Sequence, residues 1–198
     1  TAPASAASWT LASPGDHALT LETTSGVPTV TVNALGDNAV AQLDVRLAGT
    51  AGLVKAGAGT LALQRPLELT GQLNVAAGTL RFDADSSLAA STVNVSAGTG
   101  TLEVNGGSLT ASGATTVNGA GGSLIVNDGS ASFAAVNTNN SANGLIRING
   151  GSFEAASINI PRSSDRSPSF AFGFVVTGGT ATVANTIGIG TNNSWGSM

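Results

Sequence analysis

Residues 102–107 read Leu102-Glu103-Val104-Asn105-Gly106-Gly107, and this phrase, an apolar-x-apolar triplet followed by a short polar turn, returns along the chain. The triplet begins at Leu80, Leu102, Leu124 and Ile146, at three equal intervals of 22 residues, and a last copy begins at Phe174. Self-similarity at a fixed period is the sequence signature of a repeat architecture.

Each interval also contains two further strand-like triplets. The second begins at Leu88, Leu109, Ala131, Phe153 and Ala181, and the third at Val93, Val117, Val136, Ile158 and Ile187. A propeller blade needs about 40 residues, and leucine-rich repeats carry outer helical segments. Three short strands in each turn of about 22 residues instead predict an all-β fold, a right-handed parallel β-helix (solenoid) whose turns stack about 4.8 Å apart.

Period-two alternation assigns the faces of these strands. The first and third residues of each triplet are expected to point inward, and the central residues to form outward columns. The most regular outward column is predicted to be an asparagine ladder, in which stacked amides hydrogen-bond along the axis. Its members are Asn74, Asn94, Asn118, Asn137 and Asn159. The alternative interpretation of this column is a ligand-binding face.

Two other polar features belong to the turn after the first strand. Asn105, Asn127 and Asn149 are predicted to serve a sharp corner there, since Asn tolerates positive φ. Glu103 follows Arg81 in the outward column, which predicts a surface ion pair between them.

The repeat divides the chain into two parts. Residues 1–50 repeat less cleanly and are expected to form either irregular early turns or a small β cap, while residues 51–198 form the regular solenoid. The interval before Phe174 is longer than the others, 28 residues, which predicts an insertion loop at 161–168. Insertions in repeat proteins often carry binding residues, so Arg162, Asp165 and Arg166 are a candidate recognition loop; the alternative is a mobile surface loop.

Composition excludes several functional classes. The net charge is −4 with seven Lys and Arg in all, so the chain has no basic face for nucleic acid. No apolar run approaches the roughly 20 residues of a membrane-spanning helix, so no membrane insertion by this segment is expected. The chain has no Cys, which excludes disulfides and thiolate metal sites. Its first residues, Thr1-Ala2-Pro3-Ala4, fit either removal of a signal peptide or a segment cut from a longer chain.

No catalytic constellation stands out. The single His17 is not part of a recognisable catalytic constellation of Ser, His and Asp in the sequence, and Asp83 with Asp85 offers at most a weak cation site in one turn. Polysaccharide-degrading β-helices work with clustered carboxylates and basic residues on one outer face, and no such cluster is visible. We therefore expect no enzyme, no catalytic or metal residues and no cofactor.

One segment carries a family resemblance. Residues 52–63, Gly-Leu-Val-Lys-Ala-Gly-Ala-Gly-Thr-Leu-Ala-Leu, resemble the passenger-associated repeat of autotransporters, and residues 73–82 are similar to its closing half. The resemblance implies a right-handed β-helix outside the cell, at a bacterial surface, without catalytic residues in the repeat.

These observations predict a non-catalytic extracellular structural or adhesive protein, such as a surface stalk or an element of a self-assembling filament or surface layer. The alternative is a carbohydrate-binding or polysaccharide-degrading β-helix. The expected partners are the chain itself, end to end, or further β-helix repeats of a longer chain, with a host or matrix surface ligand as another possibility. Uncovered solenoid ends present unpaired strand edges, which is why self-association is expected.

Overall fold

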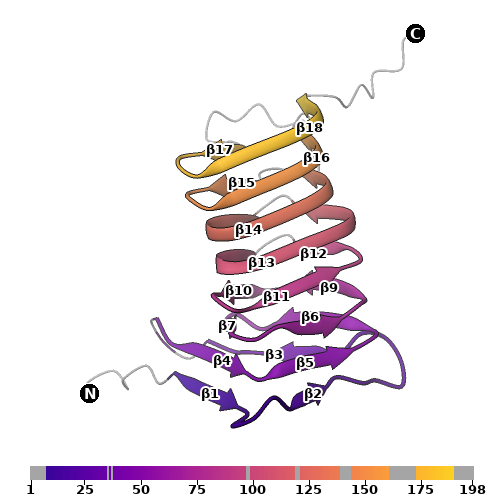
Figure 1. Cartoon of the computed structure of the whole chain (residues 1–198), viewed down its shortest axis with the longest axis vertical. Helices are drawn as coiled ribbons and strands as arrows, with labels where there is room; N and C mark the ends of the chain where they lie inside the picture. Colours follow the sequence, from indigo (N-terminus) through magenta and orange to yellow (C-terminus); the bar gives the residue numbers. More distant parts are fainter. Residues whose placement is uncertain are drawn as a thin grey trace.

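The computed structural model describes residues 8–34, 36, 38–96, 99–118, 121–138, 144–160 and 173–189. All regular elements in these residues are β-strands, and every pairing between them is parallel. Figure 1 shows the strands coiled into turns that stack along one axis, from the N-terminal turns at the bottom to the C-terminal turns at the top. The predicted β-solenoid with a spacing of about 22 residues is confirmed.

The strands form three ladders along the axis. Ladder one contains β1 (Trp9–Ala12), β4 (Val40–Asp44), β7 (Thr60–Leu63), β10 (Gly78–Asp83), the first parts of β13 (Gly100–Val117) and β14 (Ser123–Thr138), β15 (Leu145–Ile148) and β17 (Phe174–Val176). Its register joins Leu80, Leu102, Leu124, Ile146 and Phe174, as the repeat predicts.

Ladders two and three are built in the same way. Ladder two has a section of β2 (Ala18–Thr20), β5 (Arg46–Gly49) and β8 (Leu67–Leu69), and a section of β11 (Ser87–Ala90), the middle of β13 and β14, β16 (Ser152–Ile160) and β18 (Thr180–Ile189). Ladder three has β3 (Thr29–Thr31), β6 (Gly52–Ala56), β9 (Gln72–Val75), β12 (Val93–Val95) and the last parts of β13, β14, β16 and β18.

The described strands between Trp9 and Gly49 belong to the same ladders as the later strands. β1 pairs with β4, β2 with β5 and β3 with β6, all in parallel. The strands of these early residues therefore extend the three ladders of the solenoid.

The core is a continuous apolar column inside the coil. Leu80, Phe82, Leu102, Val104 and Leu124 are all fully buried, with the outward residues between them exposed or partly so. This alternation follows from the pleat, which turns successive side chains to opposite faces. Each turn covers the apolar side chains of the turn below it, so the core grows with every repeat and depends on its neighbours.

Candidate functional site

The predicted recognition loop lies outside the described residues, together with its Arg162, Asp165 and Arg166. What the structure does describe is its register: Ile146 pairs with Phe174, so 28 residues separate neighbouring strands of ladder one at this turn.

From β9 to β16, the outward column of ladder three is asparagine at every position except one. Asn94 pairs with Asn74, and its Nδ2 donates to Asn74 Oδ1 at 3.2 Å, the amide-to-amide bond expected of a ladder. Higher in the stack, Asn137 and Asn159 occupy the same column. The position between Asn94 and Asn137 is filled by Thr116.

The prediction that Asn118 belongs to this position is wrong. The third strand of that turn begins at Thr115, whose partners are Val93 and Val136, so Asn118 lies two residues beyond Thr116. It nevertheless reaches back to the column, because its Nδ2 donates to Asn94 Oδ1 at 2.7 Å and to the carbonyl of Val95 at 3.0 Å. Asn118 therefore braces the corner after ladder three.

The second asparagine set forms an axial stack instead of adopting special backbone angles. Among the described residues, only Asn38 and Asp85 combine a side chain with positive φ, so the conformational role predicted for Asn105, Asn127 and Asn149 is wrong. The positive φ at this corner belongs to glycines: Gly106, Gly129, Gly151 and Gly179.

The bonds in this second stack join consecutive turns. Asn105 Nδ2 donates to Asp83 Oδ1 at 3.4 Å, Asn149 Nδ2 donates to Asn127 Oδ1 at 2.8 Å, and Thr177 Oγ1 donates to Asn149 Oδ1 at 2.9 Å. The corner thus carries polar side chains that connect the turn of β10 with that of β13, and the turns of β14, β15 and β17 with one another.

The predicted ion pair of Arg81 with Glu103 is replaced by a pair with Asp83. Arg81 Nε and Nη2 donate to the two carboxylate oxygens of Asp83 at 2.6 and 3.0 Å. The hydrogen bond to Asp83 is the main cause that raises the pKa of Arg81 above its ordinary value, and the charge of Glu103 contributes only weakly. A bidentate carboxylate satisfies the planar guanidinium fork, which explains the preference for Asp83.

Two more arginines link turns near the N-terminal end. Arg46 donates to Asp16 at 3.2 Å and also to Glu68, so that one guanidinium joins three consecutive turns of ladder two. Arg65 pairs with Asp44 one turn away. These pairs are exposed or half exposed, and such surface pairs contribute little stability individually, about 0–1 kcal/mol.

The chain's only lysine lies inside the solenoid. Lys55 is fully buried in ladder three, between Val30 of β3 and Val75 of β9. Its Nζ donates to the carbonyl oxygens of Ala56 at 3.0 Å, Gly57 at 2.8 Å and Ala77 at 2.9 Å. One ammonium group thus satisfies carbonyls of two successive turns, and its burial lowers the pKa of Lys55 to about 8.

The sequence predictions gave Lys55 no role, although the period-two alternation of β6 indicates that its side chain points inward. Leu53 and Lys55 lie two residues apart in β6, and they pair with Leu73 and Val75, both inward residues of β9. The period-two pattern therefore predicts an inward Lys55, a position where a charged side chain needs dedicated partners.

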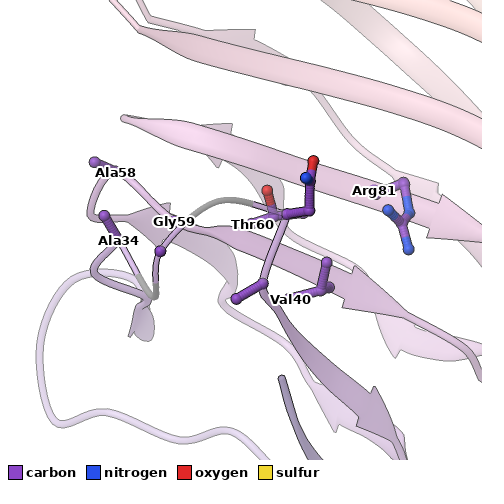
Figure 2. A pocket seen from close by; sticks show the side chains of 9 residues that line it. Ala34, Val40, Ala58, Gly59, Thr60 and Arg81 are labelled. Atoms are coloured by element: carbon purple, nitrogen blue, oxygen red, sulfur yellow. The ribbon is translucent and has the colours of Figure 1, made fainter. Parts of the chain in front are cut away.

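Two hollows of the described surface lie beside ladder one. Figure 2 shows one of about 410 Å³ beside β7, where Ala34, Val40, Ala58, Gly59 and Thr60 line the wall. Its one charged residue, Arg81, is already paired with Asp83. A second hollow, of about 380 Å³, is lined by Asp44, Gln64, Arg65, Asp83, Ala84 and Asp85.

The weak cation site suggested for Asp83 and Asp85 gains no further ligand. Asp83 is occupied by Arg81, and no group of three or more His, Cys, Asp or Glu able to hold a metal ion occurs among the described residues. Within the same residues, no helix has the length and apolar character needed to cross a membrane.

Comparison with protein-family models, with curated proteins and with solved structures finds no match to this chain. The resemblance to the passenger-associated repeat therefore stays a prediction that rests on residues 52–63 and 73–82.

Proposed function

We propose that this chain is a non-catalytic structural or adhesive element of the bacterial cell exterior, a segment of a stalk or of a self-assembling filament or surface layer. The observation that carries the proposal is the direction of its polar contacts. Asn94 with Asn74, Asn149 with Asn127, and the Arg46 pairs all run along the axis from one turn to the next. Bonds of this kind hold turns together, as a rod requires. Placement outside the cell is supported by the family resemblance alone.

The terminal turns support a second part of the proposal, in which copies stack end to end. At the N-terminal end Trp9 and Leu11 are each 45% exposed, and at the C-terminal end Ile187 and Ile189 are 51% and 75% exposed. No described residue pairs with the outer edges of β1, β2, β17 and β18. All strands of a ladder run in the same direction. The strands at the C-terminal edge of one copy can therefore pair with those at the N-terminal edge of another, as a continuation of the same parallel ladder.

A head-to-tail contact of this type is heterologous and grows without closing. The occupant we propose for the free edges is therefore a second copy of the chain. Further turns of a longer chain would fit the same edges, and a test on the 198-residue chain distinguishes the two.

Light scattering over a concentration series tests the proposal. We expect the mass to rise with concentration and electron micrographs to show rods of variable length. Ile187→Lys should suppress this growth by placing a charge at the terminal edge, whereas Ile125→Lys, on the side of a middle turn, should not. A strictly monomeric chain, or one that cleaves or saturably binds a polysaccharide in a panel assay, would contradict the proposal in favour of the carbohydrate-directed alternative.

A further inference from the structure

The wall of the solenoid contains three carbonyl groups that converge on one point. Two of them come from Ala56, the last residue of β6, and from Gly57 directly after it, and the third, from Ala77, follows β9 one turn later. The distances from Lys55 Nζ to the three oxygens span only 2.8–3.0 Å, the range of charge-assisted or well-formed N–H···O bonds.

Backbone contacts also shape the corner that carries these carbonyls. Ala56 O also accepts from Val32 N at 2.9 Å, and Ala76 N donates to Lys55 O at 2.8 Å. Gly57 and Gly78 have φ of +76° and +64°. A Cβ on Gly78 would come within 2.5 Å of Gly57 O and 2.4 Å of Gly59 O, so the corner requires this glycine.

Among the residues that the structure describes, none supplies an anionic ligand to this site. Neither β3 nor β9, the strands paired with β6, carries a charged side chain, and the nearby Arg81 and Asp83 of β10 are paired with each other. Neutral carbonyl dipoles replace the hydration shell of a monovalent cation in the same way that carbonyl rings do in ion-selective pores. A single positive charge therefore suits this site, and a divalent ion with its need for carboxylates does not.

We propose that the carbonyls of Ala56, Gly57 and Ala77 form a binding site for one ammonium-type cation, which Lys55 fills from within its own chain. The cation joins two successive turns at a corner where the backbone alone leaves carbonyls turned inward. Ala56, Gly57 and Ala77 are partly exposed, so the site lies close to the surface. This inference concerns the interior of the wall and does not depend on end-to-end stacking.

Chemical rescue tests the proposal. Lys55→Ala removes an aminopropyl group, and propylammonium has the size and charge to replace it. In thermal melts of the full chain, we expect Lys55→Ala to melt below wild type and propylammonium chloride to raise its melting temperature saturably. The same salt should leave the melting temperatures of wild type and Lys55→Met unchanged, because in both chains a long side chain at position 55 fills the space that propylammonium would enter. Tetramethylammonium chloride at equal ionic strength, whose cation has no N–H donor, and the uncharged propan-1-ol are controls.

Two results would overturn the proposal: a Lys55→Ala chain that melts with wild type, or equal shifts from propylammonium and propan-1-ol. If Lys55→Ala stays unfolded at every salt concentration, the proposal is tested on the wild-type chain by the accessibility of its lysine. Because Lys55 is the only lysine, an amine-acylating reagent followed by mass spectrometry reads its accessibility directly. We expect acylation of Lys55 only as fast as the chain unfolds; acylation of the folded chain at the rate found in urea would refute the site.

Discussion

The corner after ladder three is stabilised differently in two regions of the solenoid. Near the N-terminal end, after β6 and β9, the inward Lys55 donates to corner carbonyls from inside the wall. In the middle turns, after β12 and β13, Ser96 and Asn118 reach the asparagine column from outside, with Ser96 Oγ 3.3 Å from Asn74 Oδ1 and Asn118 Nδ2 2.7 Å from Asn94 Oδ1.

The difference shows what each solution requires. Ala56 and Ala76 occupy the corner positions equivalent to Ser96 and Asn118. The equivalence is visible in the backbone, where the amides of Ala76, Ser96 and Asn118 each donate to the carbonyl of the preceding turn. Alanine has no polar side chain with which to reach the asparagine column. An inward donor must be charged and long enough to reach several carbonyls, and it loses its hydration on burial. An outward amide keeps contact with water and needs no net charge. The Lys55 corner should therefore be more sensitive both to mutation and to pH.

Lys55→Met should produce the largest loss. Methionine keeps the volume of the side chain but removes all three donated bonds, so the carbonyls of Ala56, Gly57 and Ala77 lose the donor that connects them. We expect the free energy of unfolding at pH 7 to fall by about 2 kcal/mol, measured by urea denaturation. The matched control is Arg147→Met on the exposed outer face, which should stay within about 0.5 kcal/mol of wild type. Equal stabilities of Lys55→Met and Arg147→Met would contradict the account of this corner.

Stability should also depend on pH through Lys55. Its pKa is about 8 in the folded chain and 10.5 ordinarily, so between these values the unfolded chain binds the additional proton. The free energy of unfolding should therefore rise with pH across this window, by up to about 1.4 kcal/mol per pH unit. The chain has no Tyr or Cys, so no other side chain has its ordinary pKa there. Denaturation curves of Lys55→Met should lack the rise; parallel pH profiles would argue against a buried ammonium.

The outward corner should be less sensitive. Asn118→Ala removes the bonds to Asn94 and Val95 at a site that water can reach, so we expect a loss of about 1 kcal/mol. Thr116→Ala, at the neighbouring outward position, should change stability by less than about 0.5 kcal/mol. A loss for Asn118→Ala as large as that for Lys55→Met would remove the distinction between the two corners.

A buried polar group without partners should give the smallest change, with the opposite sign. Thr115 points inward between Val93 and Val136, and its buried hydroxyl has no hydrogen-bond partner among the described residues. Thr115→Val keeps the shape and removes the unsatisfied oxygen, so stability should increase by up to about 1 kcal/mol. A clear decrease in the midpoint of denaturation would mean that the hydroxyl has a partner.

The 22-residue period was sufficient to predict the stack of parallel turns and the inward column of ladder one. The prediction for Asn118 was wrong because the first inward residue of that strand is polar. Thr115 pairs with Val93, but the pattern of apolar triplets places the start of the strand at Val117. The distance in sequence from the preceding strand indicates the correct start of the strand, because Thr115 lies 22 residues after Val93, whereas Val117 lies 24 residues after it.

Side-chain partners were harder to predict than faces. Arg81 has Glu103 one turn away and Asp83 two residues along its own chain, and only the geometry of the two carboxylates decides between them. The three carbonyl acceptors of Lys55 could not be predicted from the sequence for a related reason. Its acceptors are backbone carbonyls, which carry no residue-specific signal, and their inward direction depends on the φ angles of glycines at the corner.

The comparison of the two corners depends on an ammonium group inside the wall, and NMR can observe that group directly. In a ¹⁵N-labelled chain the ε-amino nitrogen of Lys55 is the only lysine signal. The account predicts that this signal titrates with a midpoint near pH 8 in the folded chain. A midpoint near the ordinary value of 10.5, together with ammonium protons that exchange as fast as those of a solvated lysine, would place the amine in water and contradict the buried cation.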